Sequence, residues 1–111
     1  MVKKENSLIE QDVRVEVEKQ VGAFNASKLA RKCTYKAEYK AKYIYLLRSD
    51  SSDSDFSPIC RLAYDGDLEN MDFAIYKYSS NKYDANEMFF PGSECVDGTL
   101  HGAMKAGMKA Y

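Results

Sequence analysis

Residues 33–47 alternate between apolar or aromatic and polar side chains, and this period of two constrains the fold more than any other feature of the chain. The odd positions are Cys33, Tyr35, Ala37, Tyr39, Ala41, Tyr43, Tyr45 and Leu47, and the even positions up to 42 are Thr34, Lys36, Glu38, Lys40 and Lys42. This period is typical of a β-strand with one buried face, because successive side chains point to opposite sides. In a helix, at about 100° per residue, the odd positions would scatter around the whole circumference.

The alternating segment is too long for one ordinary strand, whose usual length is about 5–6 residues. We therefore expect a β-hairpin with its turn within residues 38–42, although no Asn-Gly or Asp-Gly pair marks the position. Ile44 and Leu46 end the polar series, so the second half of the hairpin is expected to be buried on both faces.

Helical periodicity appears at both ends of the chain. Near the N-terminus the apolar stripe is Ile9, Val13, Val17, Val21 and Phe24, and near the C-terminus it is Leu100, Ala103, Met104, Gly107, Met108 and Tyr111. Ser7 and Glu10 have capping-box spacing, which predicts a helix start there, and Asp97 or Thr99 can cap the second helix. Val13, Val15 and Val17 also alternate with charged residues, as in a strand, but the length of the stripe favours a helix.

Further strands are predicted at residues 57–64, 71–78 and 83–90, and residues 49–56 form a predicted polar loop. The expected fold is one α+β domain over residues 1–111. It has an N-terminal helix, an antiparallel meander of four or five strands and a C-terminal helix, with both helices on one face of the sheet. Residues 1–6 are expected to be flexible.

The composition is that of an ordinary globular domain, with 111 residues, 45% hydrophobic and 30% charged side chains. Leu8 and Ile9 are followed at once by polar residues, so no signal peptide is expected. No run approaches the ~18 apolar residues of a membrane helix. We therefore expect a cytoplasmic protein without membrane contact.

The segment Pro58-Ile59-Cys60-Arg61-Leu62-Ala63-Tyr64-Asp65-Gly66, followed by Phe73-Ala74-Ile75-Tyr76-Lys77-Tyr78, resembles a family of small uncharacterised bacterial proteins. Members of that family carry an arginine-containing strand of this kind before an aromatic strand. The resemblance covers roughly residues 30–83. It implies a bacterial source and supports the expected fold, and it implies no particular activity.

A basic band at residues 31–48 is the candidate surface for an anionic partner, formed by Lys36, Lys40, Lys42 and Arg48. Proteins that bind single-stranded nucleic acid combine such cations with aromatic rings on which bases stack. Strict alternation, however, would put lysines and tyrosines on opposite faces. The alternation predicts Tyr35, Tyr43 and Tyr45 mainly buried beneath the helices and the three lysines exposed, which makes binding of nucleic acid or another anionic polymer the alternative function rather than the first.

Residues with catalytic potential are few. The single histidine, His101, could act as a base oriented by Glu94 or Asp97, but no nucleophile motif accompanies it. The three cysteines, Cys33, Cys60 and Cys95, lack metal-ligand or redox spacing, so three reduced thiols are expected and no cofactor or metal. Cys33 and Cys60 are expected in the core. An enzyme using His101 is the least favoured function.

The run Met88, Phe89 and Phe90 places three large apolar side chains beside a predicted loop, and Pro91 ends it. Such a run either packs on the core or forms a contact patch. An acidic second half could also pair with the basic band of another molecule. The sequence thus favours a non-enzymatic interaction module with an unidentified protein partner, and a symmetric homodimer with Phe89 or Phe90 near the interface.

Overall fold

The computed structural model describes residues 9–30, 33–51, 55–87 and 89–111. Its elements in chain order are α1 (Gln11–Asn25), the 3-10 helix η1 (Lys28–Ala30), β1 (Thr34–Lys40), β2 (Tyr43–Ser49), β3 (Ser57–Ala63), β4 (Asp72–Lys77), β5 (Lys82–Asp84), the 3-10 helix η2 (Ser93–Cys95) and α2 (Leu100–Ala110). The strands pair antiparallel in the order β1-β2-β3-β4-β5. The predicted α+β fold, with a helix at each end of a five-stranded meander, is confirmed.

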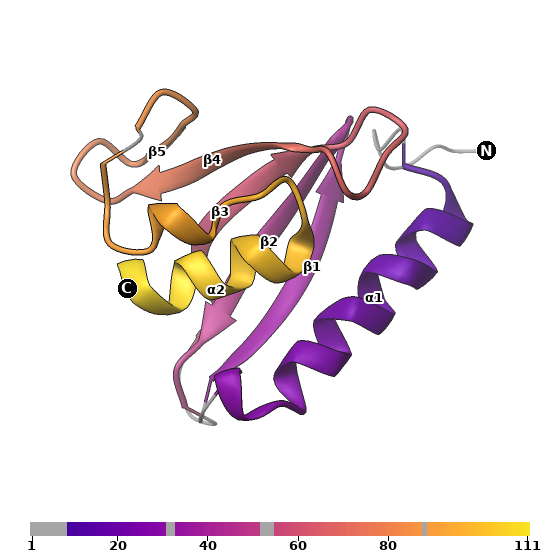
Figure 1. The fold of residues 1–111 in the computed structure, drawn as a ribbon, viewed down its shortest axis with the longest axis horizontal. Helices are drawn as coiled ribbons and strands as arrows, with labels where there is room; N and C mark the ends of the chain where they lie inside the picture. The colour runs from indigo at the N-terminus through magenta and orange to yellow at the C-terminus, as the bar shows by residue number, and fades with distance from the viewer. Residues whose placement is uncertain (1–8, 31–32, 52–54, 88) are drawn as a thin grey trace.

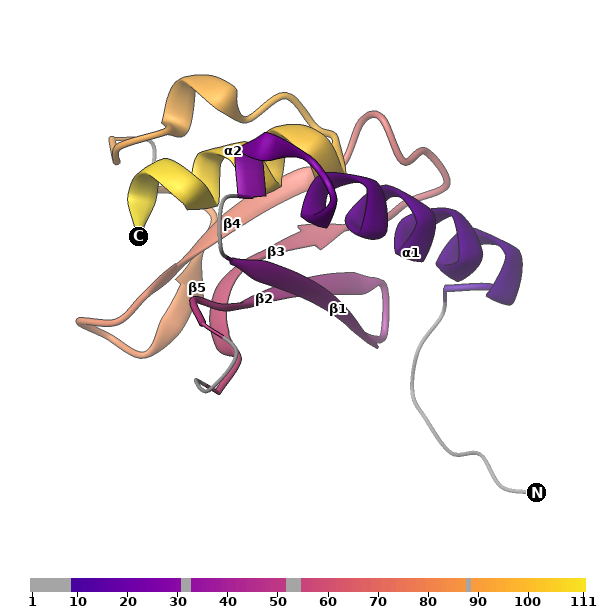
Figure 2. The same cartoon turned by 90° about the horizontal axis from the view of Figure 1, so that it is seen from below.

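Both helices lie on the same face of the sheet, and in the described part of the chain the opposite face carries no helix (Figures 1 and 2). The core between the two layers includes Val17 and Phe24 of α1, Ile44 and Leu46 of β2, and Met104 of α2. Burial of Val17, Phe24 and Met104 follows from the predicted helical stripes, because each stripe faces the sheet. The sheet therefore has one face filled by core packing and one open to a partner.

The first helix begins later than the capping box predicted. Glu10 occupies the N-cap position with no side-chain hydrogen bond to the helix, and the proposed cap Ser7 lies outside the described residues, as do residues 1–6. Val17 and Val21 are buried as expected, whereas the Val15 side chain is 58% exposed. The exposure of Val15 agrees with the helical period of 3.6 and excludes the alternating strand.

The β1–β2 hairpin turns at residues 41 and 42, within the predicted interval, and Ala41 takes a left-handed φ of 52°. The two-residue turn sets Lys40 opposite Tyr43. Residues directly opposite in an antiparallel pair share a face. Odd positions of β1 therefore share a face with even positions of β2, and the prediction of one face for all odd positions is wrong.

Contacts to the helices identify the two faces. Tyr35 of β1 donates a hydrogen bond to the Met104 carbonyl of α2 at 2.9 Å, and Tyr39 donates to Glu18 of α1 at 2.7 Å. These odd residues face the helices. Their cross-strand partners are the even residues Arg48 and Ile44. The odd residues of β2 consequently lie on the open face, so Tyr43 and Tyr45 are half-buried there rather than covered by helices as predicted.

The last predicted strand, 83–90, is only the three residues of β5. Asp84 ends it, because its Oδ1 accepts a hydrogen bond from the Asn86 backbone N–H at 2.9 Å. This local bond favours a turn over continued pairing. Glu87 makes a similar bond to the Phe89 N–H at 3.3 Å. The predicted polar loop 49–56 also starts later, since Ser49 is a buried residue of β2 and residues 52–54 lie outside the described part.

The C-terminal helix is capped as predicted by Thr99, whose hydroxyl accepts a hydrogen bond from the Gly102 N–H at 3.0 Å. Its close approach to the sheet depends on Gly107. A Cβ at this position would overlap the Tyr35 hydroxyl and the Cγ2 of Ile59. The helix therefore sits against β1 and β3 at a point where only a hydrogen atom fits.

Candidate functional site

An aromatic cluster built around one arginine lies on the open face of the sheet. Its members are Tyr43 and Tyr45 of β2, Arg61 of β3, Tyr76 of β4 and Tyr83 of β5, and we refer to them as the open-face cluster. Successive ring centroids lie 6.0 Å apart for Tyr43–Tyr45, 5.3 Å for Tyr45–Tyr83 and 5.0 Å for Tyr83–Tyr76. All five side chains are half-buried, so each presents part of its surface to solvent.

Arg61 occupies the middle of this cluster. Its guanidinium carbon lies 4.1 Å from the ring centroid of Tyr43 and 5.3 Å from that of Tyr83. These distances are within the range of cation–π attraction, which favours contact of the guanidinium with both rings. The open face thus offers a guanidinium plane next to several phenol rings.

Burial among these rings changes the chemistry of Tyr83. Desolvation, together with nearby Cys60, Tyr45 and Tyr76, raises the pKa of Tyr83 to about 12, against a smaller opposing effect of Arg61. The phenol is therefore neutral across the physiological range, and a hydrogen-bonding hydroxyl group is kept at the cluster.

The three predicted lysines border the cluster on the same face. Lys40 and Lys36 stand opposite Tyr43 and Leu47 in the hairpin, and the Lys42 ammonium is 5.9 Å from the ring centroid of Tyr43. All three lysines are exposed, as predicted. The face is not uniformly basic: Glu38 stands between Lys36 and Lys40 and lies 3.3 Å from the Lys36 ammonium.

A shallow hollow of about 160 Å³ lies between Lys42 and the cluster. Lys42, Tyr43, Arg61 and Asp72 are among the residues that line it. The hollow therefore has cations, an aromatic ring and one carboxylate within reach of the same small group. It is too small for a drug-sized ligand, whose pockets span about 300–1,000 Å³.

Arg48, the fourth predicted member of the anionic-partner surface, does not belong to it. It faces the helices and is 5% exposed, with its Nε 2.6 Å from Asp50 Oδ1 and its Nη1 donating to the Gly107 carbonyl at 2.9 Å. The prediction is wrong because the hairpin register puts even residues of β2 under α2. Arg48 is a structural anchor between sheet and helix.

The structure also identifies open-face residues that were absent from the sequence-based candidates, namely Arg61, Tyr76 and Tyr83. A usable signal was present in the hairpin. Ile44 and Leu46 are apolar at even positions directly after the polar series ends, which is what a change of face at a two-residue turn produces. Applying that change would have moved Tyr43 and Tyr45 to the face of Lys40.

The candidate dimer residues have separate environments. Phe90 packs against the core, with its ring stacked 5.8 Å from Phe73, whereas the Phe89 side chain is 93% exposed. Met88 lies outside the described residues. Of the two described residues of this run, Phe89 is the one available to a partner.

His101 lies exposed in the first turn of α2, with its ring edge-on to Phe24 at 5.7 Å. The two carboxylates considered as its orienting groups have other partners. Asp97 accepts hydrogen bonds from the backbone and hydroxyl of Thr99, and Glu94 lies 2.8 Å from the Lys109 ammonium. His101 is near enough to Asp97 to help lower the pKa of that carboxyl, after the larger effect of the Thr99 hydrogen bond. Among the described residues no hydrogen bond joins His101 to either carboxylate, and no nucleophile motif accompanies it.

The cysteines and membrane signals add little chemistry. Cys60 is buried, and burial raises the pKa of its thiol, whereas Cys33 and Cys95 are half-buried, so the prediction of a core position for Cys33 is wrong. Within the described ranges, no three or more side chains of the metal-ligating types gather at one point. Across those same ranges, no helix combines the length and apolar character needed to cross a bilayer.

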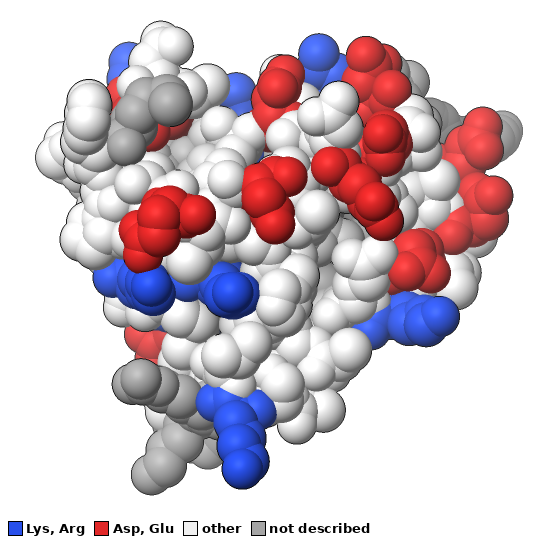
Figure 3. Space-filling view, viewed as in Figure 1, with Lys and Arg blue, Asp and Glu red and all other residues white. Residues whose placement is uncertain are grey.

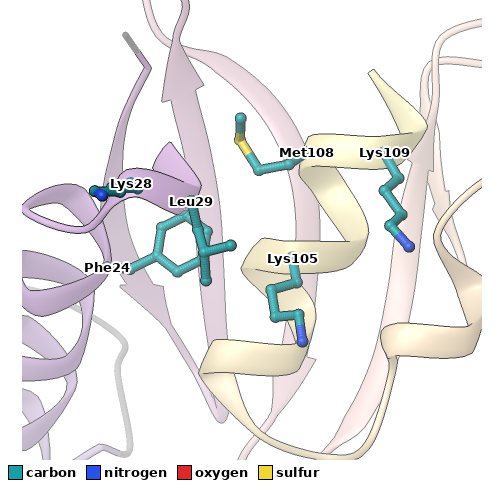
Figure 4. A pocket seen from close by; sticks show the side chains of 6 residues that line it. All are labelled: Phe24, Lys28, Leu29, Lys105, Met108 and Lys109. Atoms are coloured by element: carbon teal, nitrogen blue, oxygen red, sulfur yellow. The ribbon is translucent and has the colours of Figure 1, made fainter. Parts of the chain in front are cut away.

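A second surface lies on the helix side of the molecule. A hollow of about 240 Å³ separates η1 from α2, and it is lined by Phe24, Lys28, Leu29, Lys105, Met108 and Lys109. Figure 4 shows Phe24 and Leu29 on the η1 side of this hollow and Lys105, Met108 and Lys109 on α2. We refer to it as the basic hollow.

No protein-family model, curated protein or solved structure matches this chain. The resemblance of residues 30–83 to a family of small bacterial proteins stays a prediction.

Proposed function

We propose that this protein is a non-enzymatic binding module whose open sheet face takes single-stranded nucleic acid. The observation that carries the proposal is the cross-strand pair of Lys40 with Tyr43. It brings the exposed lysines to the same face as the tyrosines and Arg61. Lysines and tyrosines therefore share one face, whereas the alternation had predicted opposite faces.

The chemistry of this face suits unpaired bases on a phosphate backbone. Phenol rings and a guanidinium plane can stack on any base, because every base has a π-face. Lys36, Lys40 and Lys42 lie at the rim of the cluster, where phosphates would run. A duplex keeps its bases stacked on each other, so we expect a preference for single strands. Glu38 and Asp72 limit the number of phosphates held, which makes weak binding the expectation.

A cytoplasmic location in a bacterium would bring the protein into contact with such ligands. Both the location and the bacterial source stay predictions from the sequence.

Fluorescence anisotropy with a labelled oligonucleotide of about 16 nucleotides, the upper site size of a small single-strand binder, tests the proposal. We expect binding at low salt that weakens as salt rises, because each neutralised phosphate releases counterion. The Lys40→Gln/Lys42→Gln variant should reduce the slope of log K against log salt by about 1.4. The Lys19→Gln variant, with a charge change on α1 away from the open face, should keep the slope.

A ring variant separates stacking from charge. Tyr45→Leu keeps an apolar side chain but removes the ring, and the loss of one stacked base should weaken binding about tenfold. Tyr45→Phe keeps the ring and should bind like the unaltered protein. Absence of binding at low salt, or equal binding by the Leu and Phe variants, would overturn the proposal.

A further inference from the structure

The helix side of the molecule carries a second hollow next to the basic one. This hollow, of about 280 Å³, has an apolar floor that includes Phe73, Phe90 and Val96 and a rim that includes Asp72, Glu87 and Glu94. We refer to it as the acidic hollow. The two hollows thus have the same construction, an apolar floor with charged margins, and opposite charge.

One ion pair joins the two rims. Lys109 lines the basic hollow, Glu94 lines the acidic hollow, and their charged groups lie 2.8 Å apart. The hollows are therefore neighbours on one surface. Figure 3 shows this face, with lysines over α2 and η1 and acidic side chains over η2 and the loops beyond it.

Each half also carries an unusually exposed apolar side chain. Leu29, beside Lys28 on the basic half, is 46% exposed, and Phe89, beside the acidic hollow, is 93% exposed. Full exposure of a large ring is unfavourable in water, and such a ring next to a charged rim is typical of a contact surface. Burial of the Phe89 ring against a partner would therefore be favourable. Phe89 lies on the acidic half, whose charge is opposite to that of the basic hollow.

We propose that this face binds a second copy of the chain as a symmetric dimer. A two-fold axis near the Lys109–Glu94 pair would place the basic half of each copy on the acidic half of the other, so the same contact forms twice. Phe89 of each copy then covers the apolar floor of the partner's basic hollow. Lys28 and Lys105 then approach Glu87 and Glu94 across the interface. Within their own chain these carboxylates already pair with Lys77 at 3.0 Å and Lys109 at 2.8 Å, so the contacts between copies extend existing ion pairs.

The dimensions favour a protein partner over a small ligand. Both hollows are below the range of about 300–1,000 Å³ that drug-sized ligands occupy, and each suits a single large side chain. A second copy supplies such a side chain and the complementary charges at once. The acidic hollow adjoins the open-face hollow, because both are lined by Asp72, Phe73 and Ala85. The two proposals are therefore tested separately, Phe89→Ser for the dimer and Tyr45→Leu for nucleic-acid binding.

Light scattering at micromolar concentration tests the dimer. The unaltered chain should have the mass of two copies, and Phe89→Ser should raise the dissociation constant at least about tenfold while the circular dichroism spectrum is unchanged. Val15→Ser removes another exposed apolar side chain, on α1, and should leave the dimer intact. A mass of one chain for the unaltered protein overturns the proposal.

Charge reversal tests the two-fold arrangement. Lys105→Glu and Glu94→Lys should each weaken the homodimer, because both of its contacts then bring like charges together. An equal mixture of the two variants should restore a dimer, because both contacts of the mixed dimer again join opposite charges. In one contact the charges at positions 105 and 94 are exchanged, and in the other the original Lys105 and Glu94 meet. A dimer that survives Phe89→Ser and both reversals lies elsewhere, for example at a sheet edge, and also overturns the proposal.

Discussion

The guanidinium of Arg48 donates a 2.9 Å hydrogen bond to the carbonyl oxygen of Gly107 and thereby joins β2 to the last turn of α2. The same carbonyl accepts the backbone N–H of Tyr111 at 3.1 Å. Helix C-termini carry partial negative charge, so a buried cation at this position is stabilised. Asp50 compensates the positive charge of Arg48 from the solvent side at 2.6 Å.

Replacing Arg48 by Met should lower the free energy of unfolding by about 1.5–3 kcal/mol, the range for hydrogen bonds to charged groups. The side chain keeps its apolar stem, so the loss reports mainly on the polar contacts with Gly107 and Asp50. Urea unfolding measures it. Lys36→Met, a change to an exposed lysine, should stay within about 0.5 kcal/mol, and an equal loss in both variants would contradict the anchoring role of Arg48.

Gly107→Ala should destabilise the protein by about 1–3 kcal/mol, because the new methyl group overlaps the Tyr35 hydroxyl and Ile59. Helix propensity alone predicts the opposite sign, since Ala is better than Gly by about 1 kcal/mol. Gly22→Ala, in α1 with nothing within 4 Å of the added atom, is the matched control and should stabilise. Thermal unfolding of both variants decides between packing and propensity.

Acid should remove the contribution of Asp50. The hydrogen bond from Arg48 holds the pKa of Asp50 below its usual value. A lowered pKa stabilises the fold above the unfolded value of about 3.9, and this stability is lost as the pH falls through the folded value. Asp50→Asn should therefore be less stable than the unaltered protein at neutral pH by under about 1 kcal/mol, because the carboxylate is largely exposed.

The difference in unfolding free energy between Asp50→Asn and the unaltered protein should shrink as the pH falls below about 4. Urea unfolding at a series of pH values measures it. Asp65→Asn, in the exposed β3–β4 connection, should match the unaltered protein at neutral pH. A constant difference for Asp50→Asn at every pH would show that the lost stability does not come from the charge.

Alkali should destabilise the sheet through Tyr83. Its pKa is raised to about 12 by burial, whereas an unfolded tyrosine titrates near 10. The contribution of neutral Tyr83 to the free energy of unfolding is fully present below pH ~10 and is lost as the pH rises through 12. Tyr83→Phe removes the titrating group and should make the fall in stability between these values shallower. An unchanged fall would contradict the buried environment assigned to Tyr83.

Local periodicity predicted the elements because it depends on neighbours only. The period of two gave strands on both sides of residue 41, and the stripe from Val13 to Phe24 gave α1. Boundaries were less predictable. Glu10 is the N-cap of α1, and Asp84 ends β5 by accepting a hydrogen bond from the Asn86 backbone N–H. A hydrophobic pattern contains little information on single contacts of this kind.

The two candidate surfaces were predictable in part. The exposure of Lys36, Lys40 and Lys42 follows from their polar positions, and the apolar run pointed to Phe89. Phe90 was not separable from Phe89 by pattern, since both are apolar and adjacent. Their difference arises from one ring contact, Phe90 on Phe73, between segments far apart in the chain.

The sequence by itself determined the element types, their order and the α+β class, because apolar spacing selects helix or strand locally. The tertiary structure decided which face each side chain occupies. A turn of two residues at Ala41 and Lys42 pairs odd with even positions, and a shift of one residue would send every side chain of β2 to the other face. Arg48 thus meets Gly107, 59 residues away, while Tyr43 joins Lys40, because register and packing are settled by many weak contacts at once.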